Sequence, residues 1–309
     1  MIAQSLIADP LPSWNDGQPK QTIIQFVHDV TDPDSQNYLP HGDRLAVFDN
    51  DGTLWQEKPL YVQLVFVLDQ LKTLAPQHPE WQTEEPFKIF LTDPNPDLKT
   101  LGTVENLLTL ALATHTGMTQ TEFDVQVQKF LTQAKHPRFQ KPYTELIYQP
   151  MVELVNYLKL NDFQVYICSG GGVDFIRAFS EEAYGIPPEN VIGTAVEKTF
   201  QVSSQGISLM REPKLVKPIN DKAGKPVNID RYIGKIPAIA VGNSDGDIEM
   251  LQYAASSSQA NLELLLHHDD AEREFDYDHG TEKALTLANE NDWIVISLKK
   301  DFKRVFPNS

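Results

Sequence analysis

The chain has 309 residues, of which 41 % are hydrophobic and 22 % are charged. This composition is typical of folded globular proteins, and it excludes fibrous or low-complexity chains. Lys and Arg number 26 against 43 Asp and Glu, so the net charge is −17 at pH 7, which argues against nucleic acid and anionic membranes as partners.

Cysteine content and apolar runs bear on the compartment. Cys168 is the single cysteine, so the fold does not depend on an internal disulfide. No run of about 18 apolar residues is present, so we expect no membrane span. The first ten residues, MIAQSLIADP, lack basic residues, which does not fit a signal peptide. We expect a cytoplasmic protein, although a mature exported chain would have the same features.

The first predicted elements lie before residue 58. Apolar positions between residues 22 and 30 predict one helix. Leu45–Phe48 is a continuous apolar run flanked by turn residues, which is typical of a parallel strand buried on both faces.

Residues 58–162 are predicted to form an all-helical insert. Apolar residues recur there at three- and four-residue spacing, and no convincing strand interrupts them. Thr119 followed by Glu122 fits a capping box, and Pro150 suits the first turn of a helix.

The remaining chain alternates strands and helices. Strands are predicted at Phe163–Cys168, Ala238–Val241 and 261–268, and the first two lead through a glycine or polar turn into a helix. Residues 191–215 predict a β-hairpin, and a helix is expected around residues 281–289. Residues 1–57 and 163–309 therefore predict an α/β core with a doubly wound, Rossmann-like parallel sheet.

Polar residues follow three of the predicted strands. Their carboxyl ends should face one crevice, where ligands bind in such sheets. This crevice would collect Asp49, Asp51, Thr53, Ser169, Asn243, Asp245 and Asp247. Neighbouring carboxylates repel unless a cation or a shared proton intervenes, and Mg²⁺ prefers a few such oxygens together with water and phosphate.

The strings DNDG and SDGD also suggest a calcium loop. An EF-hand requires glycine at position six and glutamate at position twelve. With Gly52 or Gly246 at position six, position twelve is Lys58 or Gln252. An EF-hand is excluded.

The same residue types suit phosphoryl transfer. One aspartate can attack phosphorus and form an acyl phosphate, while a second aspartate two residues later protonates the leaving oxygen. VFDNDGT, VYICSGG and AVGNSDGDIEML, together with a lysine in NDKAGKPVNIDRYIG, resemble in order the four motifs of the haloacid dehalogenase-like (HAD) hydrolase superfamily. The resemblance spans Leu45 to Leu251 and is greatest to its phosphoserine-phosphatase-like branch. For the lysine, Lys225 matches better than Lys214, Lys217 or Lys222.

The resemblance implies a role for each matching residue. Asp49 would be the nucleophile and Asp51 the general acid and base. Thr53, Ser169, Gly170 and Lys225 would form the phosphate-binding side, with Thr53 ordering the loop. Asp49, the Asp51 carbonyl, Asn243 and Asp247 would hold Mg²⁺. Asn243 stands where the family usually has aspartate, so the site has one negative charge fewer. Residues 58–162 would be a helical cap inserted after the first motif.

The predicted function is a Mg²⁺-dependent phosphatase (a phosphoric monoester hydrolase) that acts on a small phosphorylated metabolite through an aspartyl-phosphate. Two alternatives stay open: a phosphotransferase or phosphomutase, and a degenerate phosphate-binding homologue suggested by Asn243. A dehalogenase would need neither Asp51 nor a metal, so Asp51 and the acidic turn after the third strand argue against it. The substrate and the oligomeric state are not predicted.

Several other residues are predicted to be structural. Cys168 is expected in the core. His267–Asp270 is expected to be a solvated strand end rather than a second metal site, and residues 272–280 a charged surface turn. Trp55 and Glu57 could line the substrate pocket. Alternatively, Trp55 could pack in the core and Glu57 could face solvent.

Overall fold

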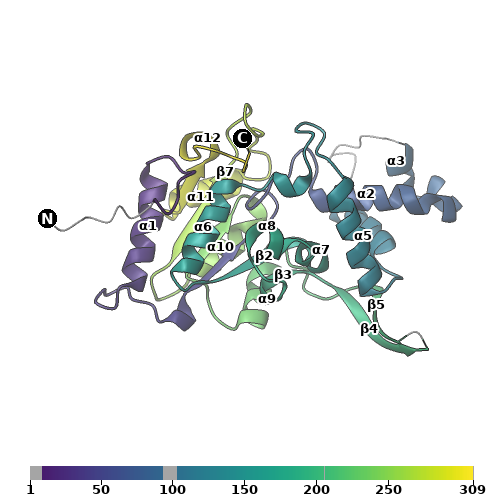
Figure 1. Cartoon of the computed structure of the whole chain (residues 1–309), viewed down its shortest axis with the longest axis horizontal. Coiled ribbons are helices and arrows are strands. Elements are labelled where there is room, and N and C mark those ends of the chain that lie inside the picture. The colour runs from purple at the N-terminus through teal and green to yellow at the C-terminus, as the bar shows by residue number, and fades with distance from the viewer. Residues whose placement is uncertain (1–8, 93–102, 205, 309) are drawn as a thin grey trace.

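A six-stranded parallel sheet forms the centre of the computed structural model, which describes residues 9–92, 103–204 and 206–308. The strand order is β3-β2-β1-β6-β7-β8, and all neighbouring strands run parallel. The strands are β1 (Leu45–Phe48), β2 (Gln164–Gly172), β3 (Val191–Thr194), β6 (Ile239–Gly242), β7 (Leu262–His267) and β8 (Ile294–Ser297). The predicted doubly wound fold is confirmed (Figure 1).

Helices cover both faces of the sheet, which explains the uninterrupted apolar run in β1. Ala46 and Phe48 pack into one core cluster with α1 (Gln18–Thr31) and α6 (Gln149–Leu160). Val47 points the other way, into a second cluster. That second face is covered by α9 (Gly224–Ile233), α10 (Ile248–Ala255) and α11 (Glu282–Glu290). The short α12 (Leu298–Asp301) follows β8.

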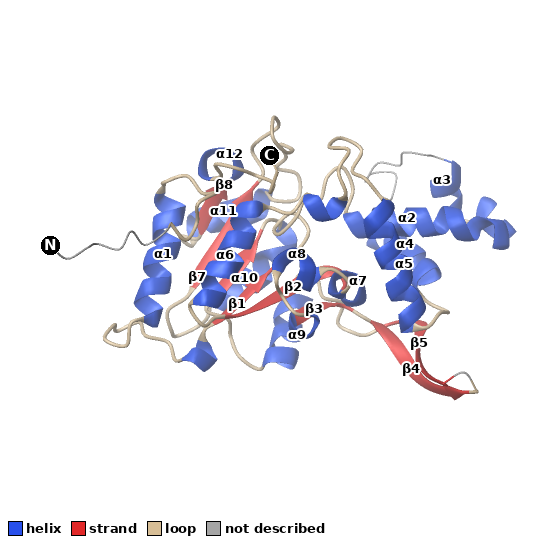
Figure 2. Cartoon of the chain, in the orientation of Figure 1, coloured by secondary structure: helices blue, strands red, loops and turns tan. Residues whose placement is uncertain are grey.

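A helical body lies beside the sheet (Figure 2). It contains α2 (Val62–Leu74), α3 (Phe87–Thr92), α4 (Val104–His115) and α5 (Gln120–Gln133). Leu64, Leu71 and Phe90 belong to a separate core cluster there. The predicted capping box at Thr119 is present at the start of α5. The predicted limits of the insert, residues 58 and 162, stay a prediction; the side chains of α6 join the core of the sheet.

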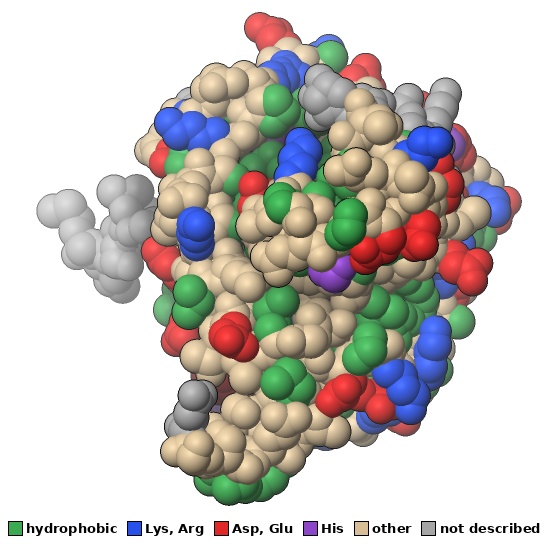
Figure 3. All heavy atoms as spheres, turned by 90° about the vertical axis from the view of Figure 1, so that its right-hand side faces the viewer, with side chains coloured by type: hydrophobic (Ala, Val, Ile, Leu, Met, Phe, Trp, Pro, Cys, Tyr) green, Lys and Arg blue, Asp and Glu red, His purple; other side chains and the backbone are tan. Residues whose placement is uncertain are grey.

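A β-hairpin projects below the helical body (Figures 1 and 2). Its strands are β4 (Val196–Ser203) and β5 (Gly206–Leu215), and β5 is joined to the start of α5 by Arg211 N–H donating to the Met118 carbonyl at 2.9 Å. Figure 3 shows apolar side chains gathered at the lower end of this face of the molecule, with charged side chains of both signs above them. Exposed apolar residues of the hairpin are Phe200, Val202, Ile207 and Leu209.

Several sequence predictions need correction. Val191–Thr194 is an edge strand of the parallel sheet, so the hairpin is shorter than expected. The glycines after Ser169 do not form a turn, because β2 continues to Gly172 across an irregularity in its pairing with β3. The helix expected next is divided into α7 (Val173–Arg177) and α8 (Ser180–Tyr184). β8 was not predicted from the sequence.

Among the described helices, none combines the length and the apolar character that crossing a membrane would require.

Candidate active site

The loop after β1 is a tight turn that presents two carboxylates. The Asn50 carbonyl accepts the backbone N–H groups of Thr53, Leu54 and Trp55 at 3.2, 2.8 and 3.3 Å. Gly52 has φ +77°, and a Cβ there would lie 2.1 Å from the Asn243 amide nitrogen. Only glycine fits both conditions, which explains the DG step of the motif.

Three separate elements bring their charged groups together at the carboxyl end of β1. Lys225, in the first turn of α9, places its Nζ 2.7 Å from Asp49 Oδ1 and 2.5 Å from Asp247 Oδ1. The other oxygen of Asp247 accepts the backbone N–H groups of Asn243 and Ser244, both at 3.0 Å. The lysine is therefore the centre of a buried Asp–Lys–Asp arrangement. Of the four lysines weighed from the sequence, Lys225 is the one that the fold brings to Asp49.

Asp51 is held by a residue whose role was left open. The indole N–H of Trp55 donates to Asp51 Oδ1 at 2.9 Å. The Trp55 ring is fully buried and stacks on Phe179 at 4.4 Å between centroids. Trp55 therefore packs in the core and also orients the carboxylate.

The site contains more buried negative charge than its lysine can compensate. Burial, and then the Asp247 charge, raise the pKa of Asp49 well above its ordinary value. Burial raises the pKa of Asp51 to about 6, against the opposing effect of the Trp55 hydrogen bond. Burial alone would lower the pKa of Lys225, but the charges of Asp247 and Asp49 raise it. Lys225 is therefore a permanent cation here.

These residues fit a Mg²⁺ ion. Asp49 and Asp247 share one ammonium group, and Asp51 lines the same cavity; a hard cation relieves such an excess of negative charge. No three His, Cys, Asp or Glu side chains form a metal-binding cluster within the described ranges, so Asp49 would act together with uncharged oxygens, such as the Asp51 carbonyl and the Asn243 amide. Asp245 lies elsewhere, since its Oδ1 accepts the N–H of Ala284 at 2.9 Å.

The predicted phosphate-binding residues divide into two groups. Ser169, Gly170 and Lys225 line one cavity together with Asp49, Asp51 and Asp247. Thr53 is fully buried, and its hydroxyl donates to Asn243 Oδ1 at 3.0 Å. Neither Thr53 nor Asn243 is among the residues that line the cavity.

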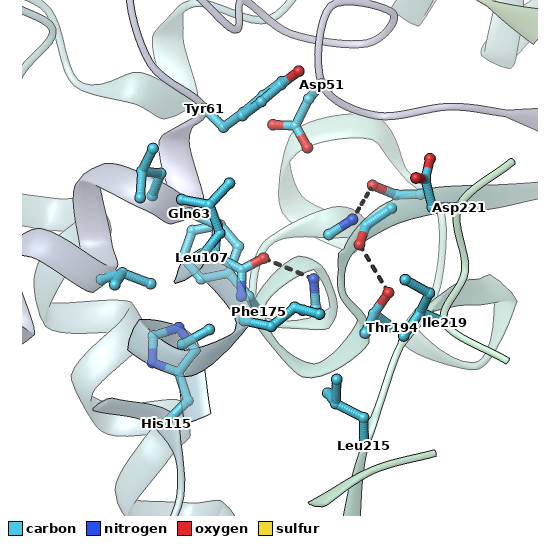
Figure 4. A pocket seen from close by; sticks show the side chains of 18 of the residues that line it. Asp51, Tyr61, Gln63, Leu107, His115, Phe175, Thr194, Leu215, Ile219 and Asp221 are labelled. Atoms are coloured by element: carbon cyan, nitrogen blue, oxygen red, sulfur yellow. Dashed lines mark hydrogen bonds between the residues drawn. The ribbon is translucent and has the colours of Figure 1, made fainter. Parts of the chain in front are cut away.

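The cavity has a volume of about 360 Å³ and extends from these residues into the helical body. Figure 4 shows Asp51 and Asp221 at one side, with Leu107, His115 and Leu215 further away. Glu57, Tyr61, Gln63, Asp174 and Arg211 also line it. Glu57 could be suggested from the sequence, but the other four residues could not, because they come from elements that share no local pattern.

The residues after β7 are not the solvated strand end that was predicted. His268 and Glu274 are 1 % and 0 % exposed. His268 Nε2 lies 2.7 Å from the carbonyl of Gly52, and its Nδ1 lies 3.1 Å from Glu274. Asp270 is also buried and pairs with Arg273 at 2.5 Å. The prediction was wrong for these positions, since the segment folds back under the β1 loop and supports it.

Cys168 lies in the core, as predicted. Burial raises the pKa of its thiol to about 11, so the thiolate that a nucleophile needs does not form near neutral pH.

Comparison with known proteins agrees with this geometry. Residues 46–252 match the model of the family described as haloacid dehalogenase-like hydrolase. Because the match covers more than half of the chain, the protein belongs to this hydrolase family, and the predicted family is confirmed. A search of curated proteins found no match.

Solved structures with the same fold include two proteins whose function is unknown. One, from Anaerococcus prevotii DSM 20548, is 16 % identical, with a TM-score of 0.58 over 93 % of this chain and 94 % of that one. Another, from Bordetella pertussis Tohama I, is 15 % identical, with a TM-score of 0.54 over 82 % and 98 %. A phosphoserine phosphohydrolase-like protein from Francisella tularensis subsp. tularensis SCHU S4 is 18 % identical over 84 % and 95 %, with a TM-score of 0.43. At these identities the first two comparisons concern the fold alone.

Proposed function

We propose that this protein is a Mg²⁺-dependent phosphatase that hydrolyses a small phosphomonoester through an aspartyl-phosphate on Asp49. One observation carries the proposal: Asp49, Lys225 and Asp247 are in contact within 2.7 Å, and Asp51 lines the same cavity two residues after Asp49. This arrangement supplies a nucleophile, a cation for the phosphoryl charge and a separate carboxyl for proton transfer.

In the first step a carboxylate oxygen of Asp49 attacks phosphorus. The new Asp49–phosphorus bond forms as the ester P–O bond breaks, and Asp51 gives its proton to the departing alcohol oxygen. A pKa of about 6 for Asp51 allows it to be the proton donor in this step. In the second step water attacks phosphorus, its proton goes to Asp51, and the Asp49 carboxylate is released.

The surrounding groups stabilise the charge on the phosphoryl oxygens. Lys225 is a buried cation, and the Ser169 hydroxyl and the Gly170 N–H would face the same oxygens. Mg²⁺, held by Asp49, the Asp51 carbonyl and Asn243 with Asp247 beside it, would supply further positive charge. Thr53 would contribute indirectly, by holding Asn243 and the loop.

The test is phosphate release from 4-nitrophenyl phosphate by purified protein, with Mg²⁺ or with a chelator, for the wild type and Asp49→Asn. We expect release that requires Mg²⁺ and is lost in Asp49→Asn. An Asp49→Asn variant as active as the wild type would refute the assignment of the nucleophile.

Absence of release by the wild type under any divalent metal would refute the phosphatase. Offering acceptor alcohols in the same assay separates hydrolysis from phosphotransfer, because a transferase would form a new ester in place of free phosphate.

A further inference from the structure

Beyond the phosphate-binding end, the cavity walls are mainly apolar. Leu64 and Val67 come from α2, and four apolar residues come from α4; the hairpin and the segment after it close the other side. The apolar lining residues are Leu64, Val67, Leu107, Leu108, Ala111, Leu112, Phe123, Phe175, Val196, Leu215 and Ile219. Figure 4 shows Leu107, Phe175 and Leu215 on the side away from Asp51.

The charged groups in this part of the cavity compensate each other. Arg211 is 4 % exposed, and its Nη1 lies 2.5 Å from Asp174 Oδ2, while Lys198 binds the other oxygen of Asp174 at 2.8 Å. The Arg211 guanidinium also donates to the His115 carbonyl at 2.6 Å and lies 3.8 Å from the centre of the Phe123 ring. Burial alone would raise the pKa of Asp174, but its hydrogen bonds and the charges of Lys198 and Arg211 lower it, so the pair stays ionised.

His115 adds no charge to this part of the wall. It is 4 % exposed and packs against Phe66 and Phe123, with ring centroids 5.0 and 5.1 Å away. Burial lowers the pKa of its imidazole to about 3. The ring is therefore neutral at physiological pH and contributes mainly apolar contact.

The phosphate-binding end is unsuited to a second anionic group on the substrate. Asp51, Glu57 and Asp221 line it with Asp49 and Asp247, and the two cations among the described lining residues, Lys225 and Arg211, are each paired with carboxylates. A substrate carboxylate would have to displace one of these pairs or remain without a partner, and an unpaired buried charge is strongly unfavourable.

We propose that the substrate is the monophosphate ester of a compact, uncharged, mainly apolar alcohol. This inference rests on the proposed phosphatase function and specifies its substrate class. A cavity of about 360 Å³ is at the small end of the roughly 300–1,000 Å³ range of small-molecule sites. After the phosphate group, room is left for a compact alkyl or aryl group.

The first experiment compares phosphate release from four esters of similar length: hexyl phosphate, 5-carboxypentyl phosphate, 6-aminohexyl phosphate and glucose 6-phosphate. We expect kcat/KM to be at least tenfold higher for hexyl phosphate than for each of the others. A preference for the carboxylate would overturn the proposal and assign Arg211 as its partner. A preference for the amine or the sugar would overturn it too.

A second experiment measures binding without turnover, by calorimetry with ethyl-, butyl- and hexylphosphonate. Affinity should rise about fourfold per added methylene, with a negative heat-capacity change that marks apolar burial. This rise without hydrolysis of any ester would support the apolar site while refuting the phosphatase. Hydrolysis without dependence on chain length would refute the apolar site alone.

A larger side chain inside the cavity should shift the preference of the enzyme towards shorter substrates. Ala111 lines the cavity from α4, so Ala111→Leu should move the optimum of an alkyl phosphate series down by two or three carbons. Ala255→Leu is the matched control, because Ala255 is exposed on α10, outside the cavity. An unchanged optimum in Ala111→Leu, or an equal change in the control, would contradict the proposal.

Discussion

At the scale of single residues, the proposed chemistry depends on how Asp51 is held. Asp51 is half-buried, and the one described side chain seen donating to its carboxylate within 2.9 Å is Trp55. Burial disfavours the charged form and the indole N–H favours it, and burial prevails, raising the pKa to about 6. Such a group can exist as an acid at the moment of P–O cleavage and as a base afterwards.

The first prediction concerns the pH dependence of this step. For hexyl phosphate with Mg²⁺, kcat/KM should fall as pH rises through the pKa of Asp51, because the protonated fraction of Asp51 decreases. Asp51→Asn should lower kcat about 10²- to 10⁴-fold, and less for 4-nitrophenyl phosphate, whose leaving group needs no proton. A pH profile of the wild type that is flat between pH 5 and 8 would contradict this role.

A second prediction isolates the indole N–H. Trp55→Phe keeps a ring against Phe179 but removes the hydrogen bond that favours ionised Asp51. The midpoint of the pH profile should therefore move up, by about one unit. Trp293→Phe is the matched control, since the buried Trp293 N–H has no hydrogen-bond partner in the described part of the chain. Equal shifts in both variants would show that the smaller ring, and not the lost hydrogen bond to Asp51, is responsible.

At the scale of elements, the parallel strands bring the site together and α9 completes it. Asp49 and Asp51 follow β1, Asp247 follows β6, and Lys225 lies in the first turn of α9. The motifs after β1 and β6 could be found from sequence because each is a short string at a strand end. His268 and Glu274 could not, because their contact with the β1 loop depends on how residues 268–278 fold back after β7.

Strand β7 contains a buried carboxyl group without a compensating charge. Glu263 is 7 % exposed, on the same face of the strand as Leu265, and its Oε1 has no partner among the described residues. Burial raises its pKa from 4.5 to about 7. The folded protein therefore binds more protons than the unfolded chain between these pH values, and the free energy of unfolding should fall as pH rises through this window.

The third prediction follows from this decrease of the free energy of unfolding with rising pH. Glu263→Gln should be more stable than the wild type at pH 8, by at most about 3 kcal/mol, with the difference vanishing towards pH 4.5. Urea unfolding at several pH values measures it. Glu290→Gln, at an exposed position of α11, is the control and should change little. A Glu263→Gln advantage that is independent of pH would refute the interpretation.

At the scale of the whole molecule, the net charge of −17 and the buried carboxylates act together. An acidic surface does not attract a phosphate ester, so under the proposed function affinity would arise locally, from Lys225 and from the proposed cation among Asp49, Asp51 and Asn243. The same carboxylates repel each other in the folded state without that cation, and binding it should stabilise the fold.

The fourth prediction is therefore a metal-dependent stability that needs no substrate. Mg²⁺ at a hundred times its dissociation constant should raise the free energy of unfolding by about 2.7 kcal/mol, and Asp49→Asn should abolish most of this increase. NaCl at equal ionic strength controls for screening of surface charge. An equal increase with NaCl, or in Asp49→Asn, would show that the ion does not bind at this site.

Features that are encoded locally could be predicted from the sequence alone. A fully apolar run such as Leu45–Phe48 is needed wherever a strand is covered on both faces, and Gly52 is needed for a turn with positive φ. Four motifs in order were therefore sufficient to predict the sheet, the family and the residues around Asp49.

Contacts between distant segments, in contrast, depend on the tertiary fold. The apolar walls of the cavity, the Arg211–Asp174 pair across it and the Trp55 hydrogen bond to Asp51 depend on the packing of helices, hairpin and sheet. Such contacts leave no periodic or local pattern in the chain, because each partner is selected by a neighbour that is tens of residues away or by the exact turn between them. The proposed substrate class depends on these contacts.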